Sequence, residues 1–224
     1  MTLDRDSMRL AVFASGGGTN FQAILDAINQ GSLPATPACC VADTPEAGAL
    51  DRADQANVPT AVVNPKNFSE PSSFGRALLE VLDAHEVEFV ALAGYMMKVP
   101  ANVVDAYRNR ITNLHPSLLP AFGGKGMYGM NVHEAVIEYG AHWSGVTVHL
   151  VDEEYDHGPV VLQEPVPVYA SDTPQALAKR IKSVEHRLYP EVLRLFADNR
   201  IEVDGRSVRI DEPNRRHPSP PPSL

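Results

Sequence analysis

Cysteine is scarce in this chain. Its 224 residues include only two cysteines, Cys39 and Cys40, which are neighbours in an apolar run. Adjacent cysteines are poorly placed to bridge each other, and no CxxC or Cys/His spacing surrounds them, so we interpret both as small buried strand residues. The sequence therefore offers no disulfide framework, and it predicts a reduced, cytoplasmic compartment.

Long apolar runs are also absent. No segment approaches the roughly 18 apolar residues that suggest a membrane span, and residues 1–9 contain no secretory hydrophobic region. Apolar residues make up 44% of the chain and charged residues 21%, as in ordinary soluble proteins. We expect one well-packed core and no membrane contact.

Positive charge is in deficit, because 19 Lys and Arg residues stand against 28 Asp and Glu residues, giving a net charge of −9. This balance argues against a nucleic-acid surface, which requires clustered Lys and Arg. A small anionic substrate is compatible with this net charge if local amides, hydroxyls and a few cations hold it. No metal-ligand spacing such as HExxH occurs, so we predict no metal and ordinary structural roles for His133, His142, His149 and His186.

The chain does contain an alternation of short apolar runs and segments of helical periodicity. Strands are predicted at residues 10–14, 38–42, 60–63, 89–93, around 113–115, at 146–150 and at 160–168, with helices at 21–28, 47–57, 74–84, 100–107, 131–139 and 173–197. This alternation predicts an α/β fold. We expect a three-layer sandwich around a mainly parallel, Rossmann-like sheet, with late antiparallel strands, in a single domain of residues 1–210.

The C-terminal part carries further signals. Thr173 is predicted to cap the longest helix, Pro174 to occupy its first position, and Pro190 to kink or break it. Residues 201–210 alternate around an Asp-Gly pair at 204–205, which predicts a terminal hairpin. Residues 211–224 are rich in proline and poor in apolar area, so we expect a disordered tail.

Asn113 and His115 form a first candidate site. Side chains two residues apart in a strand point to the same face, so this amide and imidazole can converge on one ligand. Pro116 places the pair at a strand end, where open α/β sheets bind ligands. An imidazole that acts as an acid or base needs a carboxylate to tune it, and Asp156 in an acidic loop is the candidate. The alternative is that Asp156 is an ordinary turn residue.

A glycine loop between a predicted strand and helix forms a second candidate site. The backbone N–H groups of Gly17, Gly18, Thr19 and Asn20 could hold a phosphate at the positive end of the helix. The spacing is neither GxGxxG nor GxxxxGK[ST], which favours a lone phosphate monoester over a dinucleotide or a nucleoside triphosphate. On the loop alone, a turn that merely reverses the chain is equally compatible.

Five motifs together resemble one family. They are Ser15-Gly16-Gly17-Gly18-Thr19-Asn20, Leu92-Ala93-Gly94-Tyr95-Met96, Asn113-Leu114-His115-Pro116-Ser117-Leu118-Leu119-Pro120, Asp156-His157-Gly158-Pro159 and Glu185-His186-Arg187-Leu188-Tyr189-Pro190. In this order they resemble the phosphoribosylglycinamide formyltransferases over residues 9–204. The motif around Asn113 is shared with other folate-dependent formyltransferases and hydrolases, whereas the first and last motifs specify the purine-pathway members.

The resemblance implies transfer of a formyl group from 10-formyltetrahydrofolate to the amine of 5-phosphoribosylglycinamide in de novo purine biosynthesis. Asn113, His115 and Asp156 match the family's catalytic triad. Asn113 and a protonated His115 are expected to stabilise the oxyanion that forms when the amine attacks the formyl carbon. Asp156 is expected to keep His115 protonated at need and, through water, to help move the proton from the attacking amine to the leaving folate nitrogen.

The resemblance also implies two binding regions, a phosphate region in the N-terminal half and a folate region in the C-terminal, catalytic half. The acceptor is expected at Gly17, Gly18, Thr19, Asn20 and Glu185. The folate is expected at Met96, Met97, Lys98, Val99, Asn113, Asp152, Glu153, Glu154, Tyr155 and Asp156. Family members often carry Arg in place of Met97 and near Pro71, so Lys98 is expected to replace one of these charges toward the glutamate tail.

The glycine-rich segment 121–130 is predicted to be a lid that orders over substrate. The expected partners are the two small molecules named above, without nucleic acid, and a homodimer is compatible with the resemblance. Two other functions remain open from the sequence: a formyltetrahydrofolate hydrolase and a non-catalytic nucleotide-binding module.

Overall fold

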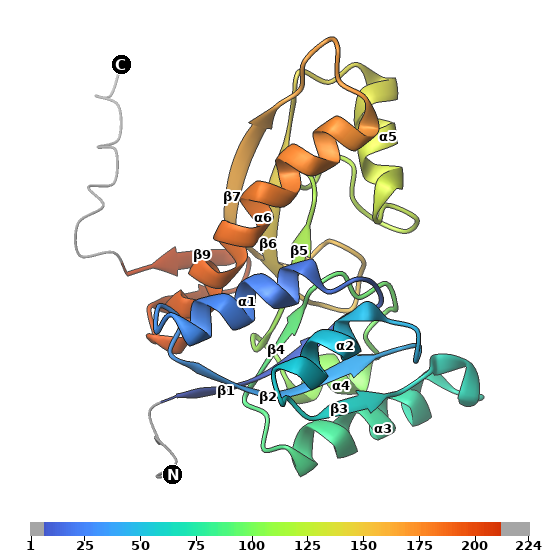
Figure 1. Cartoon of the computed structure of the whole chain (residues 1–224), viewed down its shortest axis with the longest axis vertical. Coiled ribbons are helices and arrows are strands. Elements are labelled where there is room, and N and C mark those ends of the chain that lie inside the picture. The colour runs from blue at the N-terminus through green and yellow to red at the C-terminus, as the bar shows by residue number, and fades with distance from the viewer. Residues whose placement is uncertain (1–6, 212–224) are drawn as a thin grey trace.

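The computed structural model describes residues 7–211, and its main element is a sheet of seven strands (Figure 1). The strand order is β3-β2-β1-β4-β5-β6-β7. The strands are β1 (Met8–Phe13), β2 (Ala35–Ala42), β3 (Thr60–Val62), β4 (Phe89–Leu92), β5 (Ile111–His115), β6 (Trp143–Leu150) and β7 (Val160–Pro167). The pairs from β3 to β5 are parallel, and β6 is antiparallel to both β5 and β7. The predicted sheet, including its late antiparallel strands, is confirmed.

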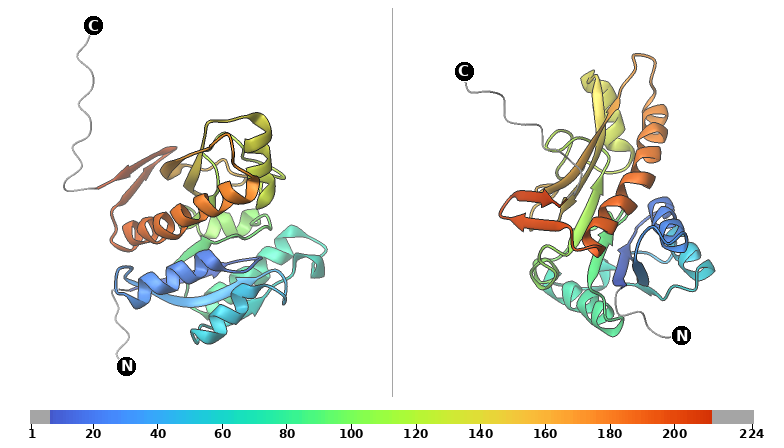
Figure 2. Two further views of the ribbon diagram at one scale, coloured as in Figure 1. Left: turned by 45° about the horizontal axis from the view of Figure 1, so that its top comes forward. Right: turned by 90° about the vertical axis from the view of Figure 1, so that its left-hand side faces the viewer.

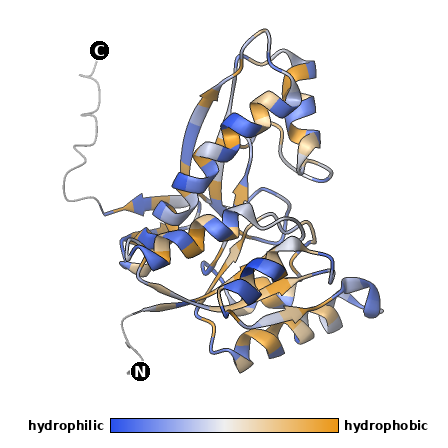
Figure 3. Ribbon diagram, in the orientation of Figure 1, coloured by the Kyte–Doolittle hydropathy of each residue, from blue (hydrophilic) through white to orange (hydrophobic). Residues whose placement is uncertain are grey.

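Helices cover both faces of the sheet, as the edge-on view shows (Figure 2). One face carries α1 (Thr19–Asn29), α2 (Gly48–Gln55) and α6 (Pro174–Ala197), and α5 (Met130–Tyr139) packs beside α6. The other face carries α3 (Pro71–Ala84) and α4 (Ala101–Ala106), and a short 3₁₀ helix, Pro65–Asn67, precedes α3. Apolar and polar residues alternate around α1 and α6, as expected of helices with one face on a sheet (Figure 3). The three layers are as predicted.

The order of the strands creates a crevice beside β1. The chain goes from β1 outward to β2 and β3 and then returns to β4 on the other side of β1. The loops that follow β1 and β4 therefore leave the sheet in opposite directions at its carboxyl edge, which is where doubly wound folds bind ligands.

The long helix α6 begins as predicted but does not break at proline. Thr173 caps it, because its hydroxyl oxygen accepts a hydrogen bond from the backbone N–H of Ala176 at 3.2 Å, and Pro174 is its first residue. Of the kink or break predicted at Pro190, the break does not occur, because Pro190 lies inside the helix. Its neighbours Tyr189 and Val192 are fully buried, and we attribute the continuity of the helix to this packing, which offsets one lost hydrogen bond.

The terminal hairpin consists of β8 (Ile201–Asp204) and β9 (Ser207–Ile210), as predicted. Its two turn residues are Gly205 and Arg206, and Gly205 takes the positive φ that such a turn requires. Both cysteines are buried in β2, also as predicted. Apart from Asp211, the predicted tail lies outside the described residues. No helix within residues 7–211 is long and apolar enough to cross a membrane.

Candidate active site

A cavity of about 380 Å³ opens at the carboxyl edge of β1, β4 and β5. Of the residues predicted from the sequence, it is lined by Gly17, Gly18, Thr19, Asn20, Met96, Met97, Lys98, Val99, Asn113, His115, Asp152, Glu154, Tyr155, Asp156 and Glu185. Segments up to 168 residues apart in the chain therefore meet around one space.

Two of the positions named above lie elsewhere. Glu153 does not line the cavity, because its carboxylate accepts a hydrogen bond from Arg108 at 3.1 Å on the outside of the loop. Pro71 is the first residue of α3 and also lies outside the cavity lining. Neither residue is positioned by this structure to contact a ligand in the cavity.

Asn113 and His115 lie at the end of β5, on one face, as their spacing predicted. The strand ends at His115, directly before Pro116. The side-chain amide of Asn113 lies 3.1 Å from His149 Nε2 and donates to Asp156 Oδ1 at 3.4 Å. Nε2 of His115 lies 2.9 Å from the carbonyl oxygen of Phe122. Both predicted side chains therefore face the same carboxylate.

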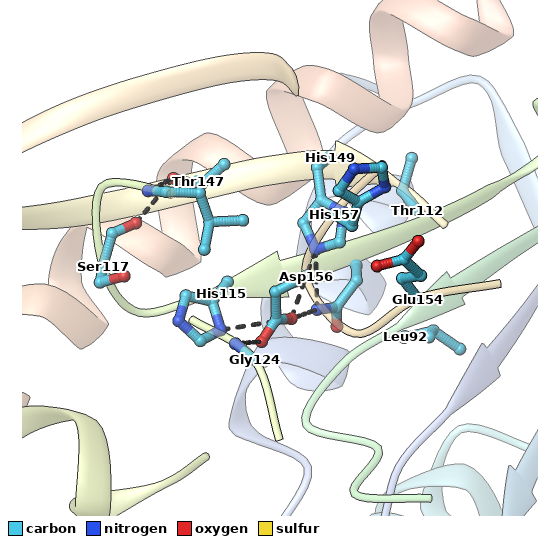
Figure 4. A network of polar contacts seen from close by, with 12 residues as sticks. Leu92, Thr112, His115, Ser117, Gly124, Thr147, His149, Glu154, Asp156 and His157 are labelled. Carbon is cyan, nitrogen blue, oxygen red and sulfur yellow. Dashed lines mark hydrogen bonds and ion pairs between the residues drawn. The ribbon is translucent and has the colours of Figure 1, made fainter. Parts of the chain in front are cut away.

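Asp156 is the centre of this polar cluster (Figure 4). Its carboxylate lies 3.6 Å from His115 Nδ1 and 3.7 Å from His149 Nε2, and it accepts the backbone N–H of Gly124 at 2.9 Å. Burial alone would raise the pKa of Asp156, but His149, His115 and the N–H of Gly124 outweigh burial and lower it. The carboxylate is therefore ionised at neutral pH.

The charge of His115 is set by its burial. Its pKa is lowered, because its burial outweighs the opposing effects of Asp156 and the Phe122 carbonyl. The imidazole is therefore neutral at pH 7, and Asp156 lies where it can stabilise the protonated form that we expect at need. Because Nε2 faces a carbonyl oxygen, the neutral ring carries its proton there and leaves Nδ1 free to accept one.

His149 belongs to the cluster, although we predicted only a structural role for it. It lies directly opposite Asn113 in the antiparallel β5–β6 pair and is buried. Nδ1 of His149 lies 2.8 Å from the carbonyl oxygen of Leu150, which leaves Nε2 toward Asn113 and Asp156. In the sequence, His149 only alternates with apolar residues, and the register between the two strands is needed to place it.

The glycine loop has the geometry of an anion site. Helix α1 begins at Thr19, directly after Gly18, whose φ of 67° suits glycine. Within residues 7–211, the backbone N–H groups of Gly17, Gly18, Thr19 and Asn20 donate to no other group. They lie at the positive end of the helix and line the cavity, so they are available to a ligand.

Glu185 and Lys182 complete this end of the cavity from α6. Glu185 is buried, and one of its carboxylate oxygens accepts a hydrogen bond from the side-chain amide of Asn20 at 3.0 Å. Burial raises the pKa of Glu185. Lys182 lies one turn before Glu185 and also lines the cavity, but we did not predict it. The signal for Lys182 was available, because residues three apart on a helix share a face.

The other end of the cavity is more apolar. Met96 and Tyr155 are partly exposed there, and the Lys98 ammonium lies 5.5 Å from the centre of the Tyr155 ring. The glycine-rich loop contributes Gly124, Gly126, Met127, Tyr128 and Gly129 to the lining. Since the N–H of Gly124 is bound to Asp156, this loop is attached to the polar cluster at its start. Its role as a lid stays a prediction.

Together, the doubly wound sheet and this cavity define a class of protein. The family model described as Formyl transferase matches residues 8–193, and the chain belongs to this family. It is similar to a chloroplastic phosphoribosylglycinamide formyltransferase of Arabidopsis thaliana, with 45% identity over 212 residues, 94% of this chain and 72% of the relative. It is also similar to the Bacillus subtilis phosphoribosylglycinamide formyltransferase, with 38% identity over 83% of this chain and 93% of the relative.

Two solved structures of other proteins have a similar fold. Glycinamide ribonucleotide transformylase 1 of Symbiobacterium toebii is 41% identical, with a TM-score of 0.87 over 94% of this chain and 97% of that one. A formyltetrahydrofolate deformylase of Pseudomonas syringae has a TM-score of 0.82 over 91% of this chain and 66% of that one. At 22% identity, the likeness to the deformylase shows the fold alone.

Proposed function

We propose that this protein transfers the formyl group of 10-formyltetrahydrofolate to the amine of 5-phosphoribosylglycinamide, in purine biosynthesis. One observation carries the proposal: a single cavity joins an anion-binding loop to an Asn-His-Asp cluster and to an apolar slot. An acceptor with a phosphate at one end and an amine at the other fits between the loop and the cluster. The relatives named above support the same activity.

The acceptor occupies the end of the cavity near α1 and α6. Its phosphate accepts hydrogen bonds from the N–H groups of the loop residues Gly17 to Asn20, and Lys182 supplies a positive charge. The carboxylate of Glu185 accepts hydrogen bonds from ribose hydroxyl groups. Asn20 already binds this carboxylate, so its orientation is fixed before the ribose arrives.

The formyl donor occupies the apolar end. The pterin ring lies among Met96, Met97, Val99 and the loop from Asp152 to Asp156. Lys98 is a cation at this end for the glutamate tail, since Met97 stands where family members often carry an arginine and the second family arginine aligns near Pro71. The donor supplies the formyl carbon, and the protein holds no covalent intermediate.

The reaction needs stabilisation of an oxyanion. A bond forms between the amine nitrogen and the formyl carbon, and the carbonyl oxygen takes a negative charge. The amide N–H of Asn113 donates to this oxygen, and a preorganised donor of this kind contributes about 3–4 kcal/mol. His115 starts neutral and, when it accepts a proton, places a positive charge near the oxyanion, as the nearby negative charge raises its pKa.

The proton comes from the attacking amine and ends on the leaving nitrogen of the folate. Nδ1 of His115 has its lone pair free to accept this proton, directly or through water, and Asp156 stabilises the imidazolium from 3.6 Å. When the bond between the formyl carbon and the folate nitrogen breaks, the proton passes to that nitrogen. Asp156 remains ionised in this scheme, which agrees with its lowered pKa.

The release of tetrahydrofolate, measured spectroscopically with each substrate omitted in turn, tests the proposal. Release that depends on phosphoribosylglycinamide is the expected result. Release without the acceptor would show a hydrolase, which the shared fold of the deformylase makes the relevant rival. No release, together with binding of a phosphorylated ligand, would show a nucleotide-binding module.

A further inference from the structure

Helix α2 holds two carbonyl groups of the glycine loop from outside the cavity. The carbonyl oxygen of Gly16 accepts the backbone N–H of Ala49 at 3.1 Å. The carbonyl oxygen of Gly17 accepts Nε of Arg52 at 2.7 Å. Contact between the loop and α2 is close, because a Cβ atom on Gly18 would lie 2.7 Å from Cα of Ala49. The loop is therefore pressed against α2.

This arrangement decides where the N–H groups of the loop point. In a planar trans peptide, the C=O and N–H groups point in opposite directions. A Gly16 carbonyl directed at α2 turns the N–H of Gly17 away from α2, and a Gly17 carbonyl directed at Arg52 does the same for the N–H of Gly18. Both glycines line the cavity and Arg52 does not, so these N–H groups are directed at the ligand space.

Arg52 is itself held in place. Its Nη1 donates to the side-chain carbonyl oxygen of Gln22 on α1 at 3.0 Å, while its Nε is bound to Gly17. One planar guanidinium thus joins α2, the loop and the first turns of α1. Lysine carries the same charge on a flexible stem but has no fixed fork with which to make both bonds.

We propose that Arg52 is a positioning residue of the phosphate site, which fixes the Gly17–Gly18 peptide so that its N–H donates to the acceptor's phosphate. Arg52 acts through the loop and does not touch the substrate. Without this bond, the peptide is free to rotate, and its carbonyl oxygen would face an incoming anion. The proposal rests on the acceptor site described above and assigns a residue that lies outside it.

The test compares Arg52→Met with Arg52→Lys. We expect both variants to raise the KM for phosphoribosylglycinamide about tenfold, because this factor corresponds to the loss of one charge-assisted hydrogen bond. The kcat and the KM for the folate should change little. Calorimetry with ribose 5-phosphate should show binding weakened by a similar factor. Arg52→Lys keeps the stem and the charge, so it remains informative if Arg52→Met fails to fold.

Arg9→Met is the matched control. The guanidinium of Arg9 also holds backbone carbonyls, those of His85 at 2.6 Å and Glu86 at 3.0 Å, but away from the cavity. This variant should lose stability and keep its KM for the acceptor.

Three outcomes would overturn the proposal. The first is an unchanged acceptor KM in Arg52→Met, and the second is a wild-type acceptor KM in Arg52→Lys, which would show that the charge alone is sufficient. The third is an equal rise of the acceptor KM in Arg9→Met. Failure of the proposed function looks different. In that case the wild-type protein would show no turnover that depends on phosphoribosylglycinamide, while ribose 5-phosphate binding would still depend on Arg52.

Discussion

The Asp156 carboxylate is shared by four groups, the side chains of Asn113, His115 and His149 and the backbone N–H of Gly124. A carboxylate with several donors keeps its charge and fixes its partners at the same time. Asp156 therefore sets the electrostatics of the cluster and also attaches the glycine-rich loop to it. A neutral residue of the same shape would change the electrostatics of the cluster more than the attachment of the loop.

Asp156→Asn should lower kcat about 10²- to 10⁴-fold, the range of general acid–base effects, with little change in the fold. The amide keeps the shape of the side chain but cannot stabilise a charged His115. The measurement is steady-state kinetics together with thermal unfolding. Asp198→Asn is the control, because Asp198 forms a surface ion pair with Arg194, away from the cavity. Near-normal turnover in Asp156→Asn would remove this residue from the mechanism.

At the residue level, side chains that are placed by local spacing could be predicted, whereas side chains that are placed by contacts between distant segments could not. Asn113 and His115 share a strand, so their common face followed from spacing alone. Placement of His149 depends on the register between β5 and β6, which no local pattern encodes. The side chain of Glu153 was assigned to the folate region, but its direction is set by Arg108, 45 residues away.

Among the helices, α6 connects the two ends of the cavity through Tyr189. This tyrosine is fully buried, and its hydroxyl lies 3.2 Å from the Leu92 carbonyl oxygen and 3.1 Å from that of Thr112. Leu92 ends β4, and Thr112 directly precedes Asn113 on β5. One hydroxyl thus fixes the helix that carries Glu185 against the two strands that lead to the folate region and the catalytic pair.

Tyr189→Phe should lower both stability and kcat, because the hydroxyl that donates to the buried carbonyls of β4 and β5 is lost and β5 can shift. We expect a loss of about 1–3 kcal/mol in the free energy of unfolding, measured with urea. Tyr107→Phe removes a similar buried hydroxyl, which donates to the Val87 carbonyl at 3.1 Å away from the cavity. This control should lose stability alone. Equal kcat values in the two variants would contradict a role for Tyr189 in the site.

The elements themselves were largely predictable, because their periodicity is local. All seven strands of the sheet and its principal helices lie where the pattern placed them, with small shifts at their ends. The exception is α6, where Pro190 indicated a kink or a break and the helix continues through it. Proline has a local cost, whereas the burial that offsets this cost depends on the whole core, which the pattern around Pro190 does not show.

For the whole molecule, buried titratable groups make stability depend on pH. Burial lowers the pKa of His133 to about 4, with help from His115 and Lys182, and it also lowers the pKa of His115. Below pH 6.5 the unfolded chain binds protons that the folded chain does not, so the free energy of unfolding decreases as the pH decreases in this range. Glu185, whose pKa is raised by burial, opposes this trend above about pH 4.5.

His133→Asn should therefore flatten the dependence of the free energy of unfolding on pH between about 4 and 6.5. One group contributes a slope of up to about 1.4 kcal/mol per pH unit in such a window. Urea unfolding at several pH values measures the slope. His142→Asn, at an exposed position, is the control and should leave it unchanged. An unaltered slope in His133→Asn would show that this histidine titrates alike in the folded and unfolded chain.

The hydrogen bond between Asn20 and Glu185 joins residues 165 positions apart. At synthesis rates of roughly 5–20 residues per second, the ribosome makes the second residue roughly 8 to 33 s after the first. Over that interval the apolar face of α1, which includes Phe21 and Ile24, has no α6 to cover it. The nascent chain therefore passes through a period in which it is a candidate client for chaperones, and this period ends only when its last long helix emerges.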